Sequence, residues 1–455
     1  MDCWMDLDLG AGTTLTRHIP EELIDKMLNL LWDDQEALKQ CSLVSRSFLC
    51  TCQKLSFECI RLEEIPDDVD DWAGHILRDS RPTMAERLEL LLKSSPHLAL
   101  LIKDLHIVDQ SDLCTWGSWL TDDESLPFIL PLLVNLERFY IASGMKDPDY
   151  IYLTHLPKPV QEAFFATWRL PKLTHIAIAR ITFGSFKDVL LVISQSSHSV
   201  RNIALCMVDG EEDREVNGNH DRDINGQLII PRPSSTRHID SLTFTSFGEH
   251  FTEFYTWLLS PETKFVWSSL HKLHFYIRGE FTFQEDLSVF RRILTASPSV
   301  EELHVVMYEL FRFEGRNTWT ESGPQEPIDI SSIRVLHLVT DLFGSGLSIL
   351  DWWCDNLASA PSLALEDLEI YVFPAYSCRP AAALDLIRRL DKILSSTERD
   401  INLKIRILPT RNDNLCLVPE DLRHCFTGLR AKGRLEVDCV DDDGLKAYTG
   451  YEEDI

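Results

Sequence analysis

The sequence predicts an α/β protein in which a small three-helix head precedes a long βα solenoid with a parallel, concave sheet. Two observations support this fold class. A short extended unit of the form L-x-φ, where φ is apolar, returns at similar intervals along most of the 455 residues. Stretches with apolar residues at helical spacing lie between these units. We therefore expect a flexible N-terminus (1–14), the head (15–62), a helical linker (63–95), the solenoid (96–440) and an acidic tail (441–455).

The head is predicted from the apolar spacing of residues 15–62. Pro20 suits the first position of a helix, and an apolar stripe runs from Leu23 to Leu31. The aspartates at 33–34 can cap a second helix, and a third helix is expected to begin near Leu43 or Val44 and to carry Phe48. So small a bundle cannot easily enclose all of its apolar side chains. Some of them must face another surface, in this chain or on a partner.

The solenoid is predicted from the spacing of the L-x-φ units. Their middle residues are His106, Tyr140, Ala177, Ala204, Thr243, His274, His304, His337, Glu369, Lys404 and Glu436. The mean spacing is 33 residues, which is the length of one supersecondary unit and is typical of a solenoid. Stacked βα units give a parallel sheet on one side and helices on the other. A conventional α/β domain is the alternative interpretation of the same alternation.

Two parts of the sequence resemble known protein families. The repeat resembles an irregular leucine-rich repeat of the long type, although the regular L-x-x-L-x-L-x-x-N/C-x-L register is absent. The segments "IPEELIDKML", "ALKQCSLVSRSF" and "LSFECIRL" resemble the F-box over residues 15–62. Ile19 stands where the F-box usually has Leu, and Phe48 stands where Trp is common. The chain thus resembles the F-box proteins of mushroom-forming fungi, whose remaining chain is often a degenerate leucine-rich repeat.

The resemblance implies a substrate receptor of a Skp–cullin–F-box ubiquitin ligase. A Skp-type adaptor would dock on the F-box and link the chain to a cullin, and the solenoid would bind an unknown protein target. Carried over by position, the adaptor-binding residues are Ile19, Pro20, Leu23, Ile24, Met27, Leu28, Leu43, Val44 and Phe48. Such docking is a helix-in-groove contact with a buried apolar centre. Three alternatives remain: a head that only caps the solenoid, an F-box scaffold that binds the adaptor without directing degradation, and an α/β-domain enzyme with a deep polar pocket.

Composition and motifs argue against several other classes of function. A net charge of −28 argues against nucleic acid or an anionic membrane as the main partner. The N-terminus does not resemble a secretory signal, and the twelve scattered cysteines without a CxxC pair suggest reduced thiols in the cytoplasm or nucleus. The sequence has no G-x-S-x-G, no P-loop and no H-E-x-x-H motif. We therefore expect no enzyme activity, no cofactor and no metal.

One group of residues is a candidate target-binding face. His274, His304 and His337 occupy successive L-x-φ units and should point outward onto the concave face beside Glu369. Like charges this close oppose one another, so at most one or two imidazoles should protonate easily, helped by Glu369. Together with Tyr140 they form a hypothetical recognition face whose binding is pH-dependent. The alternative is that polar residues are merely tolerated there and that His recurred by repeat duplication.

Overall fold

The computed structural model describes most of the chain in short interrupted ranges. They are residues 4–5, 17–18, 20–63, 82–109, 119–143, 151–183, 186–206, 208–210, 236–245, 251–278, 283–308, 327–341, 345–360, 362–373, 380–397, 400–407 and 419–439. The chain divides into two compact units, Met1–Ile176 and Ala177–Ile455, and each is described by itself.

The protein is an α/β protein with a twelve-stranded, all-parallel sheet whose strands alternate with helices. The strands are β3 Cys59–Glu63, β4 Asp104–Asp109, β5 Arg138–Ser143, β7 His175–Ala179, β9 Asn202–Cys206, β12 Ser241–Thr245, β14 Lys272–Arg278, β15 Glu302–Tyr308, β16 Val335–Asp341, β17 Asp367–Phe373, β18 Asn402–Ile407 and β19 Leu435–Cys439. Short two- and three-residue strands lie outside this sheet: β1 Trp4–Met5, β2 Arg17–His18, β6 Ile151–Tyr152, β8 Ile181–Phe183, β10 Asp209–Gly210, β11 Arg237–His238 and β13 Phe265–Val266.

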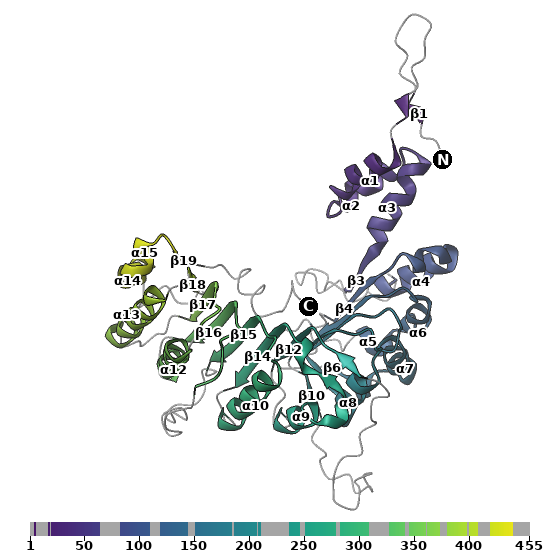
Figure 1. Cartoon of the computed structure of the whole chain (residues 1–455). Coiled ribbons are helices and arrows are strands. Elements are labelled where there is room, and N and C mark those ends of the chain that lie inside the picture. The colour runs from purple at the N-terminus through teal and green to yellow at the C-terminus, as the bar shows by residue number, and fades with distance from the viewer. Residues whose placement is uncertain are drawn as a thin grey trace, which may run out of the picture. The chain divides into compact units, whose positions relative to one another are not determined.

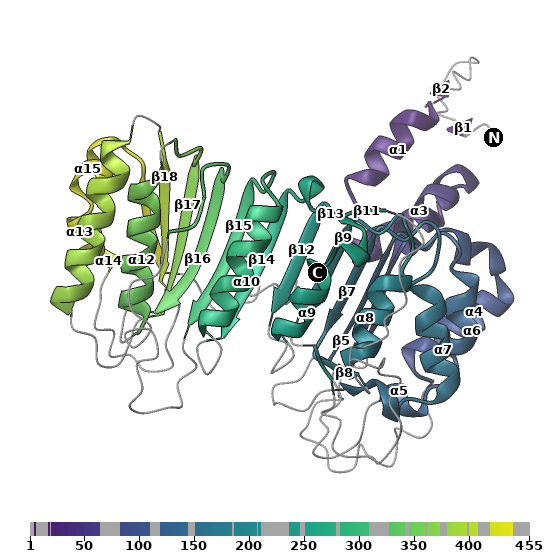
Figure 2. The same ribbon diagram turned by 60° about the horizontal axis from the view of Figure 1, so that its bottom comes forward.

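Helices follow most strands along the chain. The first unit has α1 Glu21–Asn29, α2 Gln35–Ser42, α3 Arg46–Glu58, α4 Met84–Ser94, α5 Trp119–Asp122, α6 Leu126–Ile129 and α7 Lys158–Thr167. The second has α8 Phe186–Gln195, α9 Phe251–Leu258, α10 Phe283–Ala296, α12 Ser345–Ser359, α13 Pro380–Ser396, α14 Pro419–Cys425 and α15 Thr427–Ala431. Figures 1 and 2 show α9, α10, α12 and α13 along one side of the second unit's strands. We call the opposite side of these strands the open face.

The spacing of the L-x-φ units predicted the strands well. All eleven middle residues lie on strands of the sheet, and from Ala204 to Glu436 they are partners in register. On six consecutive strands of the second unit, β12 to β18, the residue before the middle residue is a buried leucine, and these leucines form a ladder, namely Leu242, Leu273, Leu303, Leu336, Leu368 and Leu403. Burying one such side chain contributes about 1.5–3 kcal/mol. This ladder is therefore a main source of stability in the second unit.

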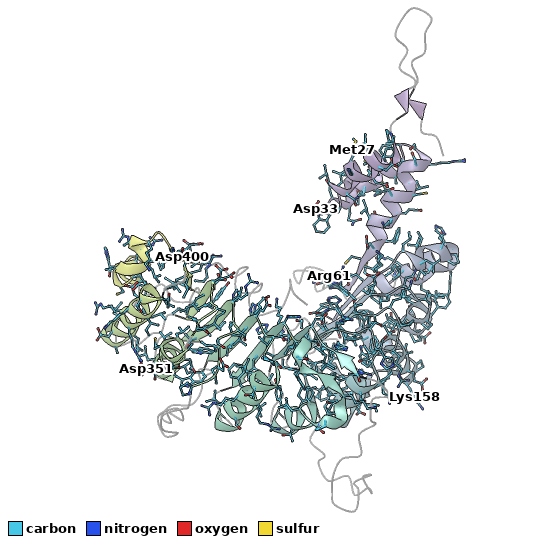
Figure 3. All side chains as sticks on the ribbon, in the orientation of Figure 1. Met27, Asp33, Arg61, Lys158, Asp351 and Asp400 are labelled. Carbon is cyan, nitrogen blue, oxygen red and sulfur yellow. The ribbon has the colours of Figure 1, made fainter. Side chains whose placement is uncertain are left out.

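The helices follow from the apolar periodicity. In α13, Ala383, Ile387, Leu390 and Leu394 are buried, at steps of four, three and four residues. This spacing places them on one side of the helix, against the sheet. Asp351 and Asp355 of α12 pair with Arg389 of the neighbouring α13, so adjacent helices also meet at their polar edges; Figure 3 labels Asp351 on α12.

The three predicted head helices are present, with two differences from the prediction. Pro20 precedes α1 as its N-cap instead of occupying its first turn. Asp34 caps α2 as expected, because its carboxylate accepts a hydrogen bond from the amide of Ala37. The third helix begins at Arg46, not near Leu43 or Val44, because the Ser45 hydroxyl accepts a hydrogen bond from the amide of Phe48 and fixes the start there.

A twelfth strand was not predicted. α3 continues directly into β3, which pairs in parallel with β4 so that Arg61 is the partner of His106 (Figure 1; Arg61 is labelled in Figure 3). Residues 59–62, which the resemblance assigns to the F-box, thus belong to the sheet. The acidic tail and most of the two acidic or polar insertions, 209–238 and 311–327, lie outside the described residues. None of the described helices has the length and apolar character needed to cross a bilayer.

Candidate functional site: the head surface and the open face

The head has a small core of its own. Ile24, Leu28, Leu38 and Cys52 are buried together, with Leu31, Cys41, Phe48 and Leu55 packed against them in partly buried positions. Ile24 and Leu28 are one helical turn apart on α1 and face inward. Two of the predicted adaptor-binding residues, Ile24 and Leu28, therefore stabilise the head itself, and Phe48 does so in part.

A second apolar stripe on α1 and its C-cap, Leu30, faces outward. Leu23, Met27 and Leu30 follow one another at steps of four and three residues, and all three are at least half exposed. α1 therefore carries two neighbouring apolar stripes, one of which packs on the head and one of which does not; Figure 3 labels Met27. Leu30 was not among the predicted contacts, although its spacing from Leu23 and Met27 could have identified it.

The turns of the head expose further apolar side chains. Leu43 caps the end of α2, and Val44 follows it before α3 begins; their exposed fractions are 79% and 64%. Trp32, between α1 and α2, is also mostly exposed. Pro20 is exposed, and Ile19 lies outside the described residues. Large apolar side chains gathered on one small module are typical of a protein-interaction surface.

The open face of the second unit carries the predicted row. His274, His304, His337 and Glu369 are consecutive partners on β14, β15, β16 and β17. The imidazole rings of His304 and His337 are stacked in parallel with centroids 4.0 Å apart, and those of His274 and His304 are 5.2 Å apart. The rings cover one another, so the row is much less exposed than expected, and His274 is buried.

Charged groups bracket the stacked rings. On one side Glu302 accepts a hydrogen bond from His304 Nε2 (2.7 Å) and pairs with Lys272 Nζ (3.1 Å). On the other side Glu369 lies 3.2 Å from His337 Nδ1. The guanidinium of Arg406 donates to Glu369 (2.9 Å) and also contacts Glu436 and Asp438.

These contacts and burial shift the pKa values of His274, His304 and the two carboxylates. Burial lowers the pKa of His274 to about 3, and burial also lowers the pKa of His304. The hydrogen bond from His304 lowers the pKa of Glu302 to about 2. Burial raises the pKa of Glu369, but the contacts with His337 and Arg406 outweigh it and bring the value to about 2. His274 is thus a neutral imidazole at neutral pH, and burial disfavours protonation of His304 beside two ionised carboxylates.

Tyr140 belongs to the first unit and has neighbours of its own. Its ring lies 5.3 Å from that of His106, its partner on β4. Burial lowers the pKa of His106, but hydrogen bonds with Asp104 and Cys59 outweigh it and raise the value to about 9. Asp104 Oδ2 also accepts a hydrogen bond from Arg138 (2.8 Å). This part of the sheet is therefore a charged network, in contrast to the neutral imidazoles of the second unit.

Two groups among the described residues bring three potential metal ligands within 4.8 Å of one another. One is Cys59, Asp104 and His106, and the other is Glu302, His304 and His337. Neither was expected from the sequence, because the ligands come from neighbouring strands more than thirty residues apart. A scan of the chain against protein-family models found no match, and a search among curated proteins found no match either.

Proposed function

We propose that this chain is a substrate receptor of a Skp–cullin–F-box ubiquitin ligase. The head docks a Skp-type adaptor, which links the chain to a cullin, and the concave side of a leucine-rich-repeat-like solenoid binds a protein target. The receptor does no chemistry itself. Its contribution is to raise the effective concentration of the target near the ligase.

The observation that carries this proposal is the exposed apolar surface of the head. The head encloses its own core with Ile24, Leu28, Leu38 and Cys52, yet it leaves the stripe of Leu23 and Met27 and the turn of Leu43 and Val44 in solvent. Apolar anchors that project from a preformed helical module match the physics of helix-in-groove docking. The sequential order of parallel strands with helices on one side supports the solenoid.

Capture of a purified Skp-type adaptor by the full chain tests the proposal. The variant Leu43→Asp/Val44→Asp places two charges in the proposed interface, and we expect adaptor affinity to fall at least about 30-fold. Leu90→Asp is the matched control, because Leu90 is a similarly exposed leucine (61%) on α4, outside the head. It should bind the adaptor as the unmodified chain does. If the unmodified chain does not bind the adaptor, or if both variants bind equally well, the receptor function is refuted.

A further inference from the structure

Three side chains on the open face converge like the ligands of a metal ion. Glu302 and His304 are two residues apart on β15 and therefore project from the same side of the strand. His337 is the partner of His304 on the neighbouring β16. One potential ligand atom from each of the three lies within 4.8 Å of the other two. Two residues of one strand and a third from the next strand thus form a cluster of three potential ligands on the sheet, which we call the platform.

A fourth nitrogen in the same row supports a ligand at this place. Only 7% of the surface of His274 is exposed, and its Nε2 has no hydrogen-bond partner. A buried polar atom without a partner is costly, and such an atom favours a ligand beside it. Its ring lies beside that of His304, 5.2 Å between centroids. A cation with its bound water at the platform supplies the kind of partner that this nitrogen lacks.

We propose that Glu302, His304 and His337 bind a divalent transition-metal cation of the zinc class. Two imidazole nitrogens and one carboxylate oxygen are a common ligand set for such cations, and hard cations such as Mg²⁺ prefer oxygen ligands. With three protein ligands the fourth coordination position stays available to water or to a group of a partner. This site does not depend on the receptor function and stands or falls separately from it.

Two features of the arrangement have to change when the cation binds. The Lys272 ammonium is 3.1 Å from Glu302 Oε1 and competes with a cation for the same carboxylate. The parallel stacking of His304 on His337, 4.0 Å between centroids, must give way to a ring rotation that turns both nitrogens toward one point. Ligand atoms around a tetrahedral zinc are about 3.3 Å apart, so the three ligand atoms, now within 4.8 Å of one another, have to move closer together.

The test titrates Co²⁺ into the untagged full chain in a Cys59→Ser background, which removes the thiol of the other cluster. We expect one saturable site with cobalt d–d absorption and without sulfur-to-cobalt charge transfer. The double variant His304→Asn/His337→Asn should weaken this site at least about 100-fold. A His97→Asn variant, which changes an exposed histidine outside the cluster, should leave it unchanged.

Lys272→Met separates loss of ligands from loss of folding. It removes the competing ammonium and keeps all three ligands, so Co²⁺ and Zn²⁺ should bind about 10-fold more tightly. Circular dichroism of each variant confirms that the fold is kept. The absence of a saturable cobalt site, an affinity that the double histidine variant does not change, or a Lys272→Met variant that binds no more tightly would each overturn the assignment.

Discussion

The division of the head into a core and an outward surface makes a quantitative prediction about two leucines. Leu38 is fully buried against Ile24, Leu28 and Cys52, whereas Leu43 is 79% exposed. Truncating a buried leucine to alanine costs about 2.7–5 kcal/mol, because the lost transfer free energy adds to the cost of a cavity. The same truncation at an exposed position usually changes stability by no more than about 0.5 kcal/mol.

The expected consequence of Leu38→Ala is local unfolding of α1–α3. A core this small supplies no more than about 3–5 kcal/mol, so the loss is comparable to the whole stability of the head. The Leu ladder of the second unit does not involve Leu38 and should stay folded. Leu43→Ala is the matched variant, with the same truncation five positions further along the chain, at the C-cap of α2.

Amide hydrogen exchange of the full chain, followed peptide by peptide, measures both effects. In Leu38→Ala we expect protection of α1–α3 to fall about 100-fold or more, since each 1.4 kcal/mol is tenfold, and peptides of β14–β18 to be unchanged. In Leu43→Ala all peptides should match the unmodified chain. If Leu43→Ala loses as much protection as Leu38→Ala, the separation of core from docking surface is incorrect, and the loss of adaptor binding in a Leu43 variant has no clear meaning.

Three further predictions concern the two units. Arg237 is buried, and its guanidinium donates to carbonyls at the end of α8, including Ser194 O at 2.7 Å. Arg237→Met should lower the free energy of unfolding by about 2–4 kcal/mol in urea titrations. Arg201 is exposed, so Arg201→Met should leave the free energy of unfolding unchanged. In Gly428→Ala the new Cβ would lie 2.7 Å from Ser395 Cβ, so we expect a loss of about 1–3 kcal/mol that Ser395→Gly partly restores in the double variant. The pKa of His106 is raised to about 9, so the stability that protonated His106 contributes is complete below pH 6.5 and is lost as the pH rises through 9. The difference in free energy of unfolding between the unmodified chain and His106→Gln should therefore shrink over this window by up to about 3 kcal/mol. A difference that stays constant with pH would contradict the raised pKa.

The sequence predicted the sheet well because one period was repeated many times. Each L-x-φ unit needs only local alternation to form a strand, and the mean spacing of 33 residues placed successive strands side by side. β3 was missed because Arg61 precedes His106 by 45 residues, outside the range of the other steps. Its apolar residues also fitted the end of the F-box pattern, so a stronger local resemblance hid the alternation.

The site was harder to predict, because it depends on which way a side chain turns. Leu23 and Ile24 are adjacent and both apolar, and only the packing of α1 on α3 decides that Ile24 is buried and Leu23 is not. The outward direction of the histidines follows from strand alternation. Their burial does not, because it arises from stacking between strands that are far apart in the sequence.

The charges near the histidine row limit what the open face can recognise. Glu302 is paired with Lys272, and Glu369 is paired with Arg406, so each carboxylate next to the imidazoles already has a basic partner. The two carboxylates are therefore locally neutralised, although the net charge of −28 can still steer a basic target from a distance. A group that binds here must either replace Lys272 at Glu302 or use the neutral imidazoles as they are. A divalent cation does both, because it competes for the carboxylate and needs unprotonated nitrogens, whereas a basic peptide gains nothing from His274 or His304.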